Sequence, residues 1–205
     1  YGEKDPEIVS YLESWAEAND ATIVKSGKYS YFVRSDSQFG KKGCAPLKNQ
    51  LKKYNLVKNK HIPAAYMQND RATRLAVLAG LIDTDGHVTR DGTRASITQG
   101  TPHKDLAYQI VDLCRSLGFY ATITEQTLNN YVYKGVKKEK RAYHINISGM
   151  QLADIPTRLP RKKTANTVVR ATSFSTGKLW TEDAGIGDYV GIKIDKNERF
   201  VLNDF

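Results

Sequence analysis

The sequence predicts an α+β fold in which helices alternate with antiparallel hairpins. Apolar residues recur at helical spacing in three stretches, residues 7–19, 71–82 and 102–117. Short runs of β-branched and aromatic residues, bounded by glycine turns, stand between these stretches. The order helix, hairpin, helix occurs twice, at about residues 7–54 and 102–160, although the two copies share little sequence identity.

The composition limits the class of protein. The 205 residues include 31 Lys and Arg against 22 Asp and Glu, which gives a formal net charge of +9. The chain has no apolar run long enough to span a membrane, and its first residues lack the apolar core of a signal peptide. Cys44 and Cys114 are too few for a disulfide scaffold, and no Cys/His spacing indicates zinc. We expect an intracellular protein, in the nucleus or cytoplasm depending on its host, with a polyanion as a suitable partner.

The elements follow one another in a regular order. Asp5 and Pro6 introduce the first helix, with Ile8, Leu12 and Trp15 on one face. A hairpin (21–24 and 29–33), a short helix (46–54) and an extended connector (58–63) follow. Asn69 or Asp70 caps the helix over 71–82, and Gly118 closes the helix over 102–117. The expected strands are 87–89, 94–99, 120–126 and 143–148, with a long hairpin tip at 129–141. Pro156 and Pro160 interrupt the stretch 154–169, and strand signals dominate from Ala171.

One string at the end of the second long helix carries the chemistry: Leu78-Ala79-Gly80-Leu81-Ile82-Asp83-Thr84-Asp85-Gly86. Its small residues allow another helix to approach closely. Asp85 falls at the C-terminal end of the helix, where the helix dipole disfavours a carboxylate and a compensating cation is expected. Two such helices side by side would bring two carboxylates together, which suits a hard divalent ion such as Mg²⁺. An ordinary buried helix with an Asp-x-Asp-Gly turn is the structural alternative.

This string resembles the LAGLIDADG motif of homing endonucleases, with Thr84 in the place of an alanine. The flanking segments 60–66 and 114–119 resemble the form found in inteins. The resemblance implies the LAGLIDADG endonuclease fold, with two αββαββα halves, a pseudo-twofold axis and curved antiparallel sheets in the DNA major groove. It also implies a monomer with an internal pseudo-dimer that cuts both strands of a long, specific DNA site.

The same resemblance implies the catalytic residues. Asp85 matches the acid that each motif gives to a shared Mg²⁺ (or Mn²⁺) site, whereas Asp83 matches an acid with a structural role at the helix end. Lys60 and Lys163 match lysines that assist charge development at the phosphate, with Lys162 as the rival of Lys163. Both matched lysines could equally be solvated phosphate anchors.

Strand parity and charge predict the residues that contact DNA. Ser96 has the same strand parity as Arg90, Arg94 and Thr98. Apart from His87, the histidines at 61, 103 and 144 show no ligand spacing and are expected to be structural or surface residues. For about half of the basic set, a solvated charged surface is the alternative. The candidates are Lys25, Lys28, Tyr29, Arg34, His87, Arg90, Arg94, Thr98, Lys134, Lys137, Lys138 and Lys140.

Residues 187–205 predict a β-hairpin that resembles the C-terminal splicing block of inteins, from which Val190 and Lys196 depart. We therefore expect an endonuclease domain over residues 1–170 and the C-terminal portion of a Hint splicing domain over 171–205. The His-Asn pair that ends the block in that family is absent, so no splicing residue is predicted here. The first motif helix is expected upstream, and the host protein (the exteins) would be a partner in the precursor.

Two other functions stay open: a catalytically inactive DNA-binding relic, and an RNA maturase or host regulator with the same fold. The retained Asp85 argues against the relic. The intein-like tail argues against a maturase, a regulator or a free-standing endonuclease.

Overall fold

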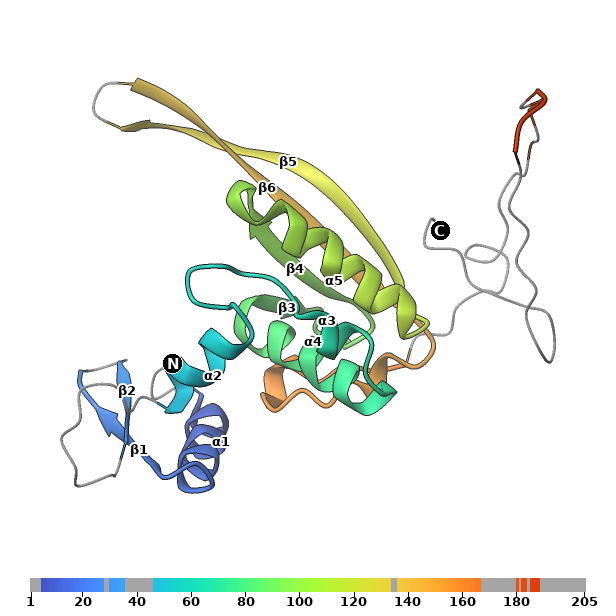
Figure 1. Ribbon diagram of the computed structural model, residues 1–205. Helices are drawn as coiled ribbons and strands as arrows, with labels where there is room; N and C mark the ends of the chain where they lie inside the picture. The colour runs from blue at the N-terminus through green and yellow to red at the C-terminus, as the bar shows by residue number, and fades with distance from the viewer. Residues whose placement is uncertain are drawn as a thin grey trace. The chain divides into compact units, whose positions relative to one another are not determined.

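The computed structural model describes residues 5–27, 30–35, 46–133, 136–166, 180, 182–183 and 185–188. The chain divides into two compact units, residues 1–171 and 172–205, and the helices and strands of Figure 1 that follow belong to the first. In the second unit Trp180 is exposed, and the Gly185 amide donates a hydrogen bond to the Asp183 carboxylate. Most of the strands expected after Ala171 fall on residues that the structure does not describe. Within the described ranges no helix is long and apolar enough to cross a membrane.

The N-terminal elements match their prediction in kind and order. Helix α1 (Pro6–Glu17) buries Ile8 and Ala16 on one face. Strand β1 (Ala21–Lys25) pairs antiparallel with β2 (Tyr31–Ser35), and α2 spans Pro46–Lys53.

Helix α4 (Arg71–Asp85) follows the one-turn helix α3 (Ala64–Met67). The Asp70 carboxylate accepts a hydrogen bond from the Thr73 amide at 2.7 Å, which caps the helix and lowers the pKa of Asp70. The helix continues three residues past its predicted end at Ile82 and brings Asp85 into its last turn. Two of its final carbonyls, those of Ile82 and Asp83, accept hydrogen bonds from the side chain of Lys162, which lies far away in the sequence.

A four-stranded antiparallel sheet with the order β3-β4-β6-β5 forms the centre of the unit. Its strands are β3 (Gly86–Val88), β4 (Ala95–Gly100), β5 (Tyr120–Tyr133) and β6 (Val136–Ser148). The short 3₁₀-helix η1 (Thr101–His103) and α5 (Lys104–Ser116) connect β4 to β5. The expected hairpin is present, but its strands are longer than predicted: β5 and β6 keep pairing through the polar, Lys-rich stretch as far as Tyr133 and Val136.

Helices α4 and α5 cover one face of the sheet (Figure 1). Leu78, Ile110, Ile97 and Ile145 are fully buried between them, and each such side chain contributes roughly 1.5–3 kcal/mol to folding. Val88, Ala95 and Ile97 are buried, as expected from strand parity. The elements α4-β3-β4-α5-β5-β6 form one αββαββ series, which is consistent with the predicted α+β class.

The chain after β6 returns to the end of α4 and forms two short 3₁₀-helices, η2 (Leu152–Asp154) and η3 (Pro160–Lys162), in agreement with the expected interruption by proline. The Ala165 amide donates to the Gly92 carbonyl at 2.8 Å, so this segment also packs on the β3–β4 turn. Within that turn the Thr89 hydroxyl and the Thr93 amide donate to Asp91, which lowers the pKa of Asp91 to about 2.

Candidate active site

The exposed carboxylate of Asp85 lies at the C-terminal end of α4, and the next residue begins β3. Asp85 and Lys60 line the same pocket, which has a volume of about 570 Å³. The other walls are mainly apolar and include Trp15, Val77 and Leu81. The pocket therefore brings together the two residues for which the sequence predicts a metal-binding and a charge-stabilising role.

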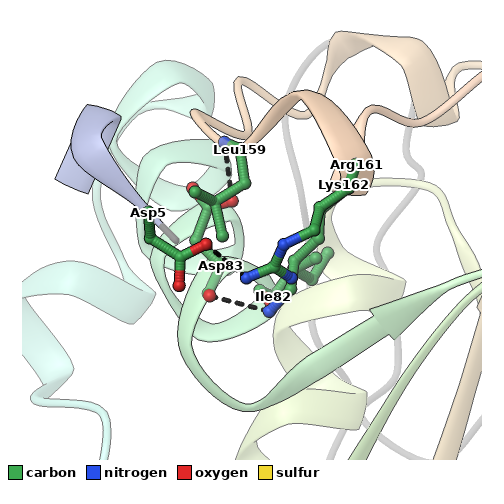
Figure 2. Close-up of polar contacts among 6 residues, drawn as sticks. All are labelled: Asp5, Ile82, Asp83, Leu159, Arg161 and Lys162. Carbon is green, nitrogen blue, oxygen red and sulfur yellow. Dashed lines mark hydrogen bonds and ion pairs between the residues drawn. The ribbon is translucent and has the colours of Figure 1, made fainter. Parts of the chain in front are cut away.

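Asp83, two residues earlier, is 4% exposed and serves a different purpose. One carboxylate oxygen accepts a hydrogen bond from the backbone N–H group of Arg158 at 2.8 Å. The other accepts from the backbone N–H group of Leu159 at 3.3 Å (Figure 2). These bonds hold the segment before η3 against the end of α4. The predicted structural role of Asp83 at the helix end agrees with this geometry.

Lys162 is 7% exposed, and its ammonium lies at the same helix end (Figure 2). Its Nζ donates to the carbonyl oxygens of Ile82 and Asp83, both at 2.7 Å. These carbonyls form the negative end of the helix dipole, so the Lys162 ammonium offsets that dipole. Burial lowers the pKa of Lys162 and Arg161 acts in the same direction, while the nearby carboxylates of Asp83, Asp5 and Asp85 oppose them.

The two candidate lysines at the end of η3, Lys162 and Lys163, have different surroundings. Lys163 is exposed, and its Nζ donates to the carbonyl of Thr157. The Thr157 hydroxyl in turn donates to the Lys162 carbonyl at 2.9 Å, which closes the loop around the buried Lys162 ammonium. Of the two, Lys162 is the lysine that contacts the end of α4, whereas Lys163 was the sequence-based choice.

The same segment reaches α1. The Arg161 guanidinium forms an ion pair with Asp5 (Figure 2), and the Arg158 guanidinium lies over the Tyr11 ring, 3.8 Å from its centroid. Residues 157–163 thus connect the start of α1 with the end of α4. All four groups are partly or fully solvent-accessible, so we expect each contact to contribute modestly.

Gly86 is required where α4 passes into β3. A Cβ atom at this position would lie 2.6 Å from the Ile82 Cα and 2.8 Å from the Ile82 carbonyl oxygen. Both atoms belong to the backbone, so a Gly86→Ala variant must shift the strand, and we expect unfolding free energy to fall by about 2 kcal/mol in urea denaturation.

Gly80 provides the matched control for Gly86. A Cβ atom at Gly80 meets no described atom within 4 Å, and alanine favours a helix interior, so Gly80→Ala should raise stability by about 0.5–1 kcal/mol. Equal effects of the two substitutions would contradict the close approach at Gly86.

The predicted DNA-contact residues fall into groups. His87, Arg90, Arg94 and Thr98 are exposed on or beside β3 and β4, and Lys25 and Arg34 are exposed on the separate β1–β2 hairpin. Lys28, Tyr29 and Lys134 lie outside the described residues. Lys137, Lys138 and Lys140 belong to β6, but their side chains are not among those described.

Sequence reasoning missed one part of the sheet surface. Opposite the helices, His87, Ser96, Asn146 and Thr122 form a cross-strand row, and Thr98, His144 and Thr124 form the next. His144 is hydrogen-bonded on this surface to Thr98 and Asn146. The signal was available: His144 and Asn146 alternate with the apolar residues 143, 145 and 147.

Metal-ligating residues do not gather in one place in the described part of the chain, where no group of three or more His, Cys, Asp or Glu side chains could hold an ion. Asp85 is thus a single exposed acid beside Lys60 rather than part of a complete cage.

Comparison with known protein families gives a match to the homing endonuclease model over residues 61–170. This range includes α3 to η3 and both Asp83 and Asp85. The chain is also similar to a replicative DNA helicase DnaB of Mycobacterium intracellulare, with 36% identity over 73 residues, 36% of this chain and 12% of that protein.

The chain is also similar to a second helicase and to an endonuclease. The ATP-dependent DNA helicase Hel308 of Thermococcus kodakarensis is 27% identical over 153 residues, 69% of this chain and 13% of the helicase. The homothallic switching endonuclease of Saccharomyces cerevisiae is 33% identical over 101 residues, 47% of this chain and 17% of that enzyme. The chain spans less than a fifth of the length of each of these three relatives.

Proposed function

The chain belongs to the homing endonuclease family, and from this membership we propose that it is the DNA-cutting part of an intein-type homing endonuclease. The intact protein would cleave both strands of a long, specific DNA site with the help of Mg²⁺ (or Mn²⁺). The observation that carries the proposal is the exposed Asp85 carboxylate beside Lys60 in one pocket, while the neighbouring Asp83 is committed to backbone bonds.

Asp85 suits one ligand position of such an ion. Mg²⁺ in nucleic-acid enzymes is commonly held by one or two carboxylates together with phosphate oxygens and water. When bound, the ion would activate water and stabilise the leaving oxygen of the phosphodiester. Asp85 is exposed and therefore accessible for this purpose, while Lys162 offsets the helix dipole at the carbonyls of Ile82 and Asp83.

Lys60 is the chain's best candidate for offsetting the charge that develops on the phosphate. Its exposed ammonium can approach a DNA strand at the pocket that Asp85 also lines. Lys163 can act in the same way only if its ammonium leaves the Thr157 carbonyl, and Lys162 only if it leaves the end of α4. The proposal therefore gives Lys60 the main role and leaves Lys162 and Lys163 as secondary candidates.

A second motif helix would complete the site. Gly80 is open on the surface of α4, and Val77 and Leu81 extend this face along an apolar pocket wall. A helix with a small residue at the facing position can pack closely there and bring a second carboxylate near Asp85. This arrangement is the internal pseudo-dimer that the LAGLIDADG resemblance implies.

The link to an intein rests on the resemblance of residues 187–205 to a splicing block and on the relatives. Short stretches of two helicases and of a switching endonuclease resemble this chain, as expected for a domain carried by unrelated hosts. If the chain is part of an intein, the host protein would form the exteins. An inactive DNA-binding relic is the alternative, and retention of Asp85 favours the active enzyme.

The salt dependence of DNA binding tests the proposed interface. The affinity of the chain for a long duplex should fall steeply between about 50 and 200 mM salt, by roughly 10³-fold or more if six or more phosphates are contacted. Arg90 and Arg94 flank the β3–β4 turn, so the double Arg→Ala variant should reduce the salt slope by about two. Lys104→Ala, on α5, should leave the slope unchanged. A flat salt response in the parent would rule out the interface.

A further inference from the structure

We propose that Asn146 reads an adenine in the DNA major groove and that His144 is the positioning residue that orients its amide. This inference rests on the proposed function, because it concerns how the DNA site is recognised. It assigns specificity to two residues of β6, one of the two central strands of the sheet. Both lie on the face opposite α4 and α5.

Cross-strand register defines the surface around them. Ser96 and Thr122 flank Asn146 on the neighbouring strands, and Thr98 and Thr124 flank His144 in the same way. All four neighbours are short hydroxyl-bearing side chains without a formal charge. The arginines of this region, Arg90 and Arg94, lie at the β3–β4 turn and not in these rows. The centre of the surface is thus suited to base edges, and its rim to phosphates.

The hydrogen bonds of His144 run in one direction. The Nε2 atom of His144 lies 3.2 Å from Asn146 Oδ1, and the amide oxygen can only accept, so Nε2 carries the proton of that bond. In the neutral ring the other nitrogen is then an acceptor. Thr98 Oγ1, which lies 3.0 Å from Nδ1, must donate to it. Donation therefore passes from Thr98 through His144 to Asn146.

This chain of bonds fixes the amide of Asn146 while leaving it able to bind a base. The amide oxygen keeps a second lone pair, and within the described part of the chain its nitrogen has no hydrogen-bond partner. A free acceptor and a free donor side by side match the N6 amino group and N7 of adenine. Guanine presents two acceptors at its major-groove edge, so it does not match the amide oxygen.

The test is a selection of random-sequence duplexes by the full 205-residue chain, followed by sequencing of the bound fraction. The parent should enrich adenine at one position of its site. Asn146→Ala should lower that preference about tenfold or more and leave the other positions unchanged. Because Asn146 is exposed, the thermal unfolding of the Asn146→Ala variant should match that of the parent. Gln68→Ala, an exposed amide next to α3, is the matched control and should keep the parent preference.

His144 is tested by two substitutions. His144→Phe keeps the ring but loses the donor, so it should weaken the adenine preference at that position by several-fold. His144→Gln retains an N–H donor and should restore part of the preference, which a purely structural role would not produce.

The outcomes distinguish a failure of this inference from a failure of the proposed function. If the parent enriches a defined site and Asn146→Ala keeps its adenine, or loses a preference for another base, the inference is wrong while the proposed function stands. If the parent enriches no DNA at all, both are overturned.

Discussion

An Asp85→Asn variant of the intact protein should bind its DNA site as tightly as the parent and cut it at least about 10³-fold more slowly. Asparagine keeps the size of the side chain but removes the negative charge that would hold Mg²⁺. Losing such an electrostatic contact at a phosphodiester costs far more in rate than in affinity, since the charge develops during the reaction. Asp85 is exposed, so the fold should be unaffected.

The measurement is single-turnover cleavage of a labelled duplex beside an equilibrium binding titration. Glu13→Gln, which removes an exposed charge from α1, is the matched control and should cut at the parent rate. If the Asn variant cuts normally, Asp85 does not hold the metal.

Asp83→Ala, unlike Asp85→Asn, should destabilise the fold and lower the free energy of unfolding by about 3 kcal/mol. The substitution leaves the backbone N–H groups of Arg158 and Leu159 without their acceptor, at roughly 1–3 kcal/mol for each group that is buried. It also removes a carboxylate whose attraction opposes the burial cost of the Lys162 ammonium.

Asp85→Ala supplies the control for Asp83, because it makes the same change in charge two residues away at an exposed site. Its stability should lie within about 0.5 kcal/mol of the parent. Urea denaturation of the three proteins compares them directly. Similar losses for both alanine variants would show that Asp83 is not the residue that joins α4 to the segment before η3.

The helices and the first strands could be predicted from sequence because their signals are local. Asp70 caps α4 and Gly118, with a φ of +84°, closes α5, so a cap and a glycine define ends that residue spacing had suggested. The end of α4 was placed too early, because the partners of its last carbonyls include Lys162, about eighty residues away. Pairing of β5 with β6 through a Lys-rich stretch likewise depends on the partner strand and not on propensity.

The candidate site likewise has one part that the sequence predicts and another that only the structure shows. The role of Asp85 and the structural role of Asp83 are expected from the resemblance of a single string to the LAGLIDADG motif, and the backbone contacts of Asp83 agree with its expected role. The separation of Lys162 from Lys163 does not follow from the sequence, because adjacent residues with the same side chain differ only in where the returning chain directs them. The alternation that carries His144 and Asn146 is visible in the sequence, but the hydrogen bond between His144 and Thr98 depends on the register of β6 against β4.

The proposed function gives this chain one carboxylate, Asp85, of a metal-dependent DNA-cutting centre. Its most direct test is to incubate the intact protein with a DNA library and Mg²⁺ and to sequence the ends that form. We expect paired double-strand ends at one long site, which disappear when the metal is chelated. Firm DNA binding without any ends, or ends that persist in the absence of metal, would contradict it.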